Sequence, residues 1–93
     1  MKFLVIHTLP TPATPEEAAP FAKKTKANAT VDAYWVRSWA QLNEQGKIVK
    51  IYCEWNAKDA EAVRKVLDKM PEFPSDGLYP MVVVDSKTSG SHN

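Results

Sequence analysis

Two neighbouring segments, VDAYWVRSWA (residues 31–40) and IVKIYCEW (residues 48–55), decide the fold. Both are rich in β-branched and aromatic residues, which favour β-strands. The connection between them is short and contains Gly46, so the two strands are expected to pair as an antiparallel hairpin. The remaining segments are placed around this hairpin.

A strand and a helix are expected before the hairpin. The segment KFLVIHT (residues 2–8) has the apolar, β-branched composition of a central strand. The segment TPEE (residues 14–17) is typical of a helix start, because Thr14 can cap the helix and Glu17 can complete a capping box. The helix should run to about Asn28, with a kink or a separate first turn at Pro20, which lacks a backbone donor.

A second helix and a last strand are expected after the hairpin. Asn56 is the predicted N-cap, and Pro71 ends the helix. Apolar residues recur between them at helical spacing: Ala60, Val63, Leu67 and Met70. Residues 81–85 are the predicted last strand, and residues 86–93 form a polar tail that is expected to be flexible.

The order strand, helix, strand, strand, helix, strand predicts an α+β fold of the ferredoxin-like βαββαβ type. In this fold an antiparallel four-stranded sheet of order 4-1-3-2 carries both helices on one face. We expect a single domain over residues 1–85, because a chain of 93 residues is short for more than one. A domain of this size has a thin core, and oligomerisation is a common remedy.

The composition excludes several classes of function. The chain has 12 basic and 11 acidic residues, a net charge of +1, so it has no strong field to attract nucleic acid or a membrane. The strand KIYCEW (residues 50–55) also lacks the basic, glycine and aromatic pattern of an RNA-recognition motif.

Cys53 is the only cysteine, so no internal disulfide can form. Because the sequence shows neither a signal peptide nor a long apolar run, a cytoplasmic location is expected.

The face of the sheet without helices, here called the open face, is predicted to be unusually aromatic. A hairpin turn at residues 44 and 45 places Trp35 opposite Glu54, Arg37 opposite Tyr52, and Trp39 opposite Lys50 on this face. The first and last strands are expected to add six more side chains: Phe3, Val5, His7, Met81, Val83 and Asp85. So large an aromatic patch usually marks an interface or a ligand site. We therefore expect a homodimer that packs through the open faces, with a pocket between the two sheets. In the alternative, the aromatic residues only hold the dimer together.

The candidate site is expected on this face. His7, Tyr52 and Glu54 come to one level if the first and third strands pair in parallel, and such side chains can bind a transition metal or relay a proton. A lone strand histidine that only forms hydrogen bonds is the alternative. Trp35, Arg37 and Trp39 are the predicted ligand-binding residues, with Arg37 suited to an anion and the tryptophans to apolar walls. Cys53 is expected in the core beneath the helices, and no catalytic residue is assigned.

The stretches YWVRSW (residues 34–39), KIYCEWNA (50–57) and DAEAVR (59–64), with the opening KFLV (2–5), resemble a family of small ferredoxin-like proteins. That family has a characterised nickel-binding dimeric member. Over residues 1–85 the resemblance implies a dimeric α+β barrel and nickel, or another divalent transition metal, as a ligand. The sequence departs from the family at two positions, because members often have histidine where Arg37 stands and tyrosine where Trp39 stands.

Three functions follow from these expectations. The first is a dimeric protein that binds a metal or a small ligand. The second is a cofactor-independent, monooxygenase-like enzyme that acts on a small aromatic or quinone-like molecule, with His7 as acid–base group and Arg37 as anion anchor. The third is an interaction module without a small-molecule site.

Overall fold

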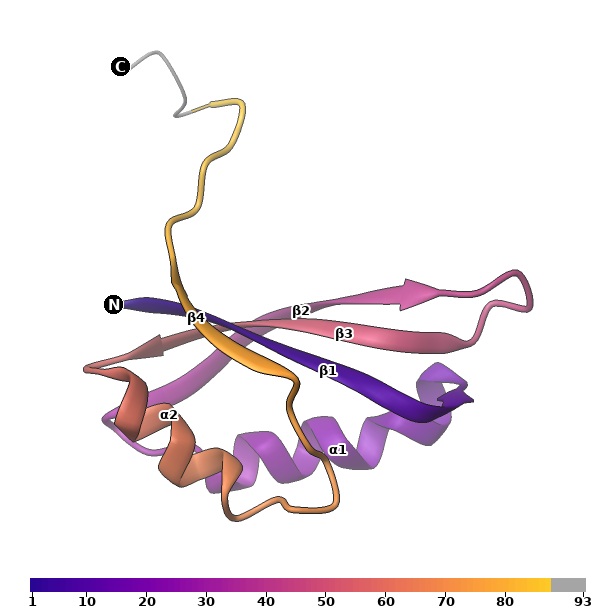
Figure 1. The fold of residues 1–93 in the computed structure, drawn as a ribbon, viewed down its shortest axis with the longest axis horizontal. Helices are drawn as coiled ribbons and strands as arrows, with labels where there is room; N and C mark the ends of the chain where they lie inside the picture. The colour runs from indigo at the N-terminus through magenta and orange to yellow at the C-terminus, as the bar shows by residue number, and fades with distance from the viewer. Residues whose placement is uncertain (88–93) are drawn as a thin grey trace.

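The computed structural model describes residues 1–87, and residues 88–93 of the predicted tail lie outside the described residues. Its elements are β1 (Lys2–Ala13), α1 (Pro15–Asn28), β2 (Ala33–Leu42), β3 (Ile48–Ala57), α2 (Ala60–Leu67) and β4 (Gly77–Met81). The four strands form one sheet of order β2-β3-β1-β4, with antiparallel pairing throughout. Both helices lie under the same face (Figure 1). The predicted ferredoxin-like α+β fold is therefore confirmed.

The start of α1 is as predicted. The Thr14 hydroxyl accepts a hydrogen bond from the Glu17 amide at 3.1 Å, and the Glu17 carboxylate accepts one from the Thr14 amide at 2.8 Å. Pro20 lies inside one continuous helix, so the prediction of a separate first turn is wrong. The helix tolerates this proline because the carbonyl that loses its donor belongs to Glu16, at the exposed start of the helix.

The start of α2 and the position of β4 differ from prediction. The N-cap is Asp59, whose carboxylate accepts from the Ala62 amide at 2.8 Å, because β3 continues through Asn56 to Ala57. The last strand is Gly77–Met81 and not residues 81–85. Its pairing with β1 ends where Met81 meets Lys2, so the chain beyond has no strand to pair with. Residues 82–84 are exposed valines on an extended segment that leaves the domain (Figure 1).

A β-bulge in β2 changes the predicted hairpin register. Trp35 pairs with Trp55, yet Arg37 pairs with Glu54, so Val36 is an extra residue in the ladder. An extra residue reverses the alternation of side chains on the bulged strand. Trp35 therefore faces the helices, which corrects its predicted place, whereas Arg37 and Trp39 lie on the open face as predicted.

The predicted orientation of β1 is wrong. This strand pairs with β3 in the antiparallel direction, with Phe3 opposite Trp55 and His7 opposite Ile51. Phe3, Val5 and His7 are buried on the helix-covered face. The antiparallel direction follows from connectivity, because α1 returns the chain so that β2 runs parallel to β1, and the hairpin then reverses β3.

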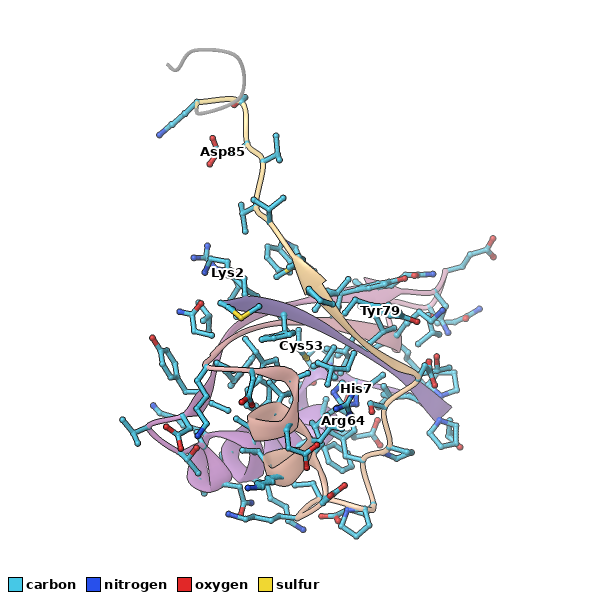
Figure 2. The ribbon with its side chains drawn as sticks, turned by 60° about the vertical axis from the view of Figure 1, so that its left-hand side comes forward. Lys2, His7, Cys53, Arg64, Tyr79 and Asp85 are labelled. Carbon is cyan, nitrogen blue, oxygen red and sulfur yellow. The ribbon has the colours of Figure 1, made fainter. Side chains whose placement is uncertain are left out.

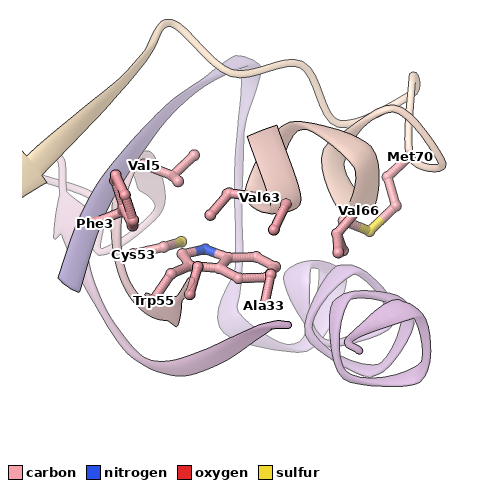
Figure 3. Packing of buried hydrophobic residues seen from close by; sticks show 10 residues of the cluster. Phe3, Val5, Ala33, Cys53, Trp55, Val63, Val66 and Met70 are labelled. Carbon is pink, nitrogen blue, oxygen red and sulfur yellow. The ribbon is translucent and has the colours of Figure 1, made fainter. Parts of the chain in front are cut away.

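The hydrophobic core lies between the sheet and the helices. Figure 3 shows Trp55 of β3 at its centre, with Phe3 and Val5 of β1 beside it and Val63 and Val66 of α2 packed nearby. Cys53 lies in this core, as predicted, and is buried. Among residues 1–87, no helix is both long and apolar enough to cross a membrane.

Candidate functional site

A cavity of about 190 Å³ lies between the helix-covered face of the sheet and α1. Its walls come from β1, β2, β3, α1, α2 and the loop before β4. They are mostly apolar, and the largest lining side chains are aromatic: His7, Phe21, Trp35, Trp55 and Phe73. The cavity is on the opposite side of the sheet from the predicted site.

The sequence of α1 explains why this space is not filled. The helix lines the cavity with the small side chains of Ala18, Ala22 and Thr25, and Phe21 is its only large lining residue. Protein interiors normally interdigitate closely, and alanine side chains are too short to reach across to the sheet. A helix that offers mainly alanine therefore leaves a gap over the strands.

His7 is the most deeply buried polar side chain in the wall of the cavity, which also contains the buried Thr25. His7 is 2% exposed, and Figure 2 shows it on the helix side of β1. Its Nδ1 lies 3.0 Å from the carbonyl oxygen of Pro74. A carbonyl can only accept, so Nδ1 carries the proton and, in a neutral ring, Nε2 does not. No hydrogen-bond partner of Nε2 is found in the described part of the chain.

The imidazole ring is held by stacking as well as by this hydrogen bond. Phe73 stacks on His7 with ring centroids 3.9 Å apart and an interplanar angle of 9°, and it also stacks on Phe21 at 4.7 Å. The three rings join β1, the loop before β4 and α1. They fix the orientation of His7 at the cavity.

Burial lowers the pKa of His7, and the Pro74 carbonyl and the charge of Asp76 oppose this shift only in part. Desolvation disfavours the imidazolium form in an apolar site. His7 is therefore neutral at neutral pH, and Nε2 presents a lone pair.

Three more side chains of this wall, Trp35, Ser38 and Cys53, are joined by hydrogen bonds. The Trp35 indole donates to the Ser38 hydroxyl at 2.8 Å, and that hydroxyl donates to the Cys53 sulfur at 3.1 Å. Burial raises the pKa of the Cys53 thiol, with the Ser38 hydrogen bond opposing it. The thiol is therefore protonated at neutral pH and behaves as a small apolar group.

On the open face, Glu54 forms a closed ionic cluster. Its buried carboxylate contacts the Lys2 ammonium at 2.6 Å and the Arg37 guanidinium at 3.1 Å. The Tyr52 hydroxyl donates to the Gln41 side chain at 2.8 Å. These groups satisfy one another on the surface of the sheet.

The predicted grouping of His7 with Tyr52 and Glu54 is therefore wrong. His7 points to the helix side of the sheet, whereas Tyr52 and Glu54 point to the open side. Directly paired residues share a face, and Tyr52 and Glu54 pair with Ile6 and Leu4, which alternate with His7 along β1. Across residues 1–87, no group of three or more histidine, cysteine, aspartate or glutamate residues is placed to hold a metal ion. The two cations beside Glu54 also disfavour a bound cation there.

The predicted ligand-binding residues are divided in the same way. Trp35 lines the cavity, whereas Arg37 and Trp39 lie on the other face. Phe73, which also lines the cavity, was not among the residues predicted for a site. Its one signal is that it is a large apolar residue in a proline-rich loop, between Pro71 and Pro74.

The pH dependence of stability provides a test of the state of His7. An unfolded histidine has a pKa of about 6.5, and the folded value is lower, so the unfolded chain binds more protons between the two values. Stability should be complete above about pH 6.5, fall as the pH drops below it, and level off below the folded pKa. His7→Phe keeps a stacking ring but cannot titrate, so its urea-unfolding profile from pH 8 to 5 should be flatter. Parallel profiles of the two proteins would show that His7 is not buried as a neutral ring.

The crystal structure of SCO4226 from Streptomyces coelicolor A3(2) matches with a TM-score of 0.73 and 17% identity, over 91% of this chain and 100% of that one. At this identity the likeness shows the fold. No curated protein matches the sequence. The family model described as nickel responsive protein SCO4226-like matches residues 3–81. The chain therefore belongs to the nickel-responsive SCO4226-like family.

Proposed function

We propose that the protein binds a small apolar molecule in the cavity between α1 and the sheet, and that it does so as a homodimer that pairs through its open faces. The observation that carries the ligand proposal is the apolar cavity of about 190 Å³ whose wall contains the buried imidazole of His7 with its unpartnered Nε2. Sites for small molecules are usually apolar hollows with a few well-placed polar groups.

The cavity is partly open to solvent, so its volume sets the size of the part of the ligand that is buried. An apolar cavity of roughly 150 Å³ in a protein interior can stay dry and bind benzene. The present cavity is somewhat larger and is also lined by aromatic and aliphatic side chains. It suits a compact molecule of about one ring.

The dimer proposal is supported by the exposed aromatic residues of the open face. Trp39, Tyr79 and Tyr34 are 53%, 52% and 47% exposed, respectively. Cross-strand pairing places all three on this face, with Tyr52 between Trp39 and Ile6. Large apolar surfaces of this kind usually mark protein interfaces, and tyrosine and tryptophan are enriched there.

Nickel, or another divalent metal, is a second candidate ligand, supported by the description of the family. Residues 1–87 of one chain do not fit a self-contained nickel centre, because they supply no group of three such ligands and the carboxylate of Glu54 is held by Lys2 and Arg37. A nickel site would therefore need donors from a second copy or from residues 88–93. Native mass spectrometry with and without nickel tests this candidate.

The enzyme alternative keeps only part of its predicted site. His7 and Trp35 line the cavity, and an unprotonated Nε2 is able to accept a proton there. Arg37, the predicted anion anchor, lies on the opposite face of the sheet. Binding in the cavity is therefore the function that the geometry supports best.

Filling the cavity should block binding. In Ala22→Leu, a larger side chain enters from α1, and we expect affinity for benzene or toluene to fall at least about tenfold, since occupied volume excludes the ligand. Trp35 and Trp55 line the cavity, so binding can be followed by tryptophan fluorescence and by the ligand-induced rise in Tm.

The matched control is Ala27→Leu, which makes the same change at an exposed position of α1 that does not line the cavity. This variant should bind as the unmodified protein does. If Ala22→Leu also binds normally, the ligand site is not this cavity.

A further inference from the structure

We propose that the cavity selects a phenol, a single-ring aromatic alcohol whose hydroxyl donates a hydrogen bond to Nε2 of His7 while its ring lies among the apolar side chains. This inference rests on the proposed function, because it names the ligand class of the same cavity.

The free hydrogen-bond acceptor in this part of the structure is Nε2 of His7. The indole Nε1 of Trp55 is the one fully enclosed side-chain nitrogen or oxygen without a partner in the described part of the chain. The unpartnered Nε2 of His7 is therefore not fully enclosed, and because His7 lines the cavity, we infer that this nitrogen is open to it. The Nδ1 hydrogen bond to Pro74 and the stacking on Phe73 prevent the ring from turning this lone pair away.

Apart from the indole N–H of Trp55, which is fully enclosed, the remaining side-chain polar groups of the wall already have partners. Trp35 donates to Ser38, and Ser38 donates to Cys53. The Thr25 hydroxyl donates to the Phe21 carbonyl at 2.7 Å within α1. The wall therefore offers a ligand one strong acceptor, Nε2, and buried acceptors favour a donor opposite them.

The lining residues limit the charge of the ligand. The described residues that line the cavity include neither lysine nor arginine, so a carboxylate or phosphate would be buried without a counter-charge. A protonated amine would likewise be desolvated without a carboxylate, because no aspartate or glutamate lines the cavity. The ligand should therefore be neutral.

The walls of the cavity limit the shape of the ligand. The flat aromatic walls of Trp35, Trp55 and Phe73 suit a flat ring, and the volume of about 190 Å³ leaves space for one ring with small substituents. A phenol meets these requirements, because it is a neutral, flat one-ring molecule with a single strong donor on the ring. Ethers and ketones of the same size would place an acceptor against the lone pair of Nε2.

The test compares three probes of similar size at pH 7.5: phenol, toluene and anisole. Phenol has a donor, toluene has a methyl group in its place, and anisole has only an acceptor. We expect tryptophan fluorescence titration to give phenol about tenfold tighter binding than toluene, the amount that one net hydrogen bond contributes, and anisole no advantage. In His7→Phe, phenol and toluene should bind alike.

The outcomes separate this inference from the proposed function. Equal binding of phenol and toluene to the unmodified protein would overturn the phenol assignment and leave the apolar cavity as a ligand site. Failure of all three probes to bind would overturn both. If His7→Phe does not fold, long-range ¹H–¹⁵N spectra of the unmodified protein replace it. The Nε2 resonance should then shift with phenol but not with toluene, and an unmoved resonance would overturn the assignment.

Discussion

Trp39→Asp should convert the proposed open-face dimer to a monomer and leave the fold of the chain intact. Trp39 is 53% exposed on the open face, directly opposite Tyr52, so its loss removes little from the core of one chain. In a face-to-face dimer the same position would be buried, and an unpaired carboxylate there is strongly unfavourable. Tryptophan is also among the residues that contribute most to interfaces, so affinity should fall by well over a hundredfold.

Native mass spectrometry and light scattering measure this change directly. The control is Val31→Asp, which places the same charge at an exposed apolar residue in the loop before β2, away from the open face. It should remain dimeric. The cavity is on the other side of the sheet, so the monomeric variant should still bind toluene. A monomer at the outset, or a dimeric Trp39→Asp, would exclude the open face as the interface.

The same spectra, repeated after addition of nickel, test the second candidate ligand. In a single chain no three histidine, cysteine, aspartate or glutamate side chains of residues 1–87 are placed together, so the monomeric variant should not retain stoichiometric nickel in a centre formed by these residues. Retention that disappears when residues 88–93 are removed would place the ligands in that segment. Retention by a monomer that lacks this segment would show that the described residues do hold the metal.

The order of elements was predictable because local patterns determine it. The capping box at Thr14 and Glu17 marks the start of α1 without any tertiary information. The extent of β4 was not predictable locally, because residues 82–84 are also good strand formers. The strand that β4 pairs with is β1, whose first residue, Lys2, is opposite Met81. Only the paired structure shows that no partner is left for residues 82–84.

The site was mispredicted because successive side chains of a strand point to opposite faces of the sheet. A shift of one residue in the strand therefore moves each side chain to the other face. The bulge at Val36 moves Trp35 to the cavity while Arg37 and Trp39 stay on the open face. On β1, the choice between Phe3, Val5 and His7 or Leu4 and Ile6 as the inward set cannot be made from hydrophobicity, because both sets are largely apolar. The contribution of His7 to the cavity thus depends on a register that the sequence leaves open.

A consequence of this core is that its central tryptophan has an unsatisfied polar group. The Trp55 side chain is buried, and its indole N–H has no acceptor among the described residues. Burying an unpaired donor costs about 1–3 kcal/mol. The net contribution of Trp55 to the free energy of unfolding is therefore the gain from packing its rings minus the cost of this unpaired donor.

Two substitutions separate these contributions. Trp55→Ala should lower the free energy of unfolding by about 3–5 kcal/mol, as large-to-small changes in cores do. Since small domains have a total of only about 5–15 kcal/mol, this loss is a large share of the stability. Trp55→Phe keeps one ring and removes the unpaired donor, so we expect it to cost much less, about 1 kcal/mol. Urea unfolding at pH 7.5, on protein free of ligand, gives both values.

Trp35→Phe is the matched comparison, because Trp35 lies opposite Trp55 in the ladder and lines the same cavity. The indole N–H of Trp35 has a partner in Ser38 at 2.8 Å, and its removal leaves that hydroxyl without a donor. Although Trp35 is less buried, its replacement by phenylalanine should therefore cost at least as much as the replacement of Trp55. If Trp55→Phe proves the more damaging of the two, the Trp55 N–H must have an acceptor in solution, and an ordered water beside it becomes the first candidate to examine.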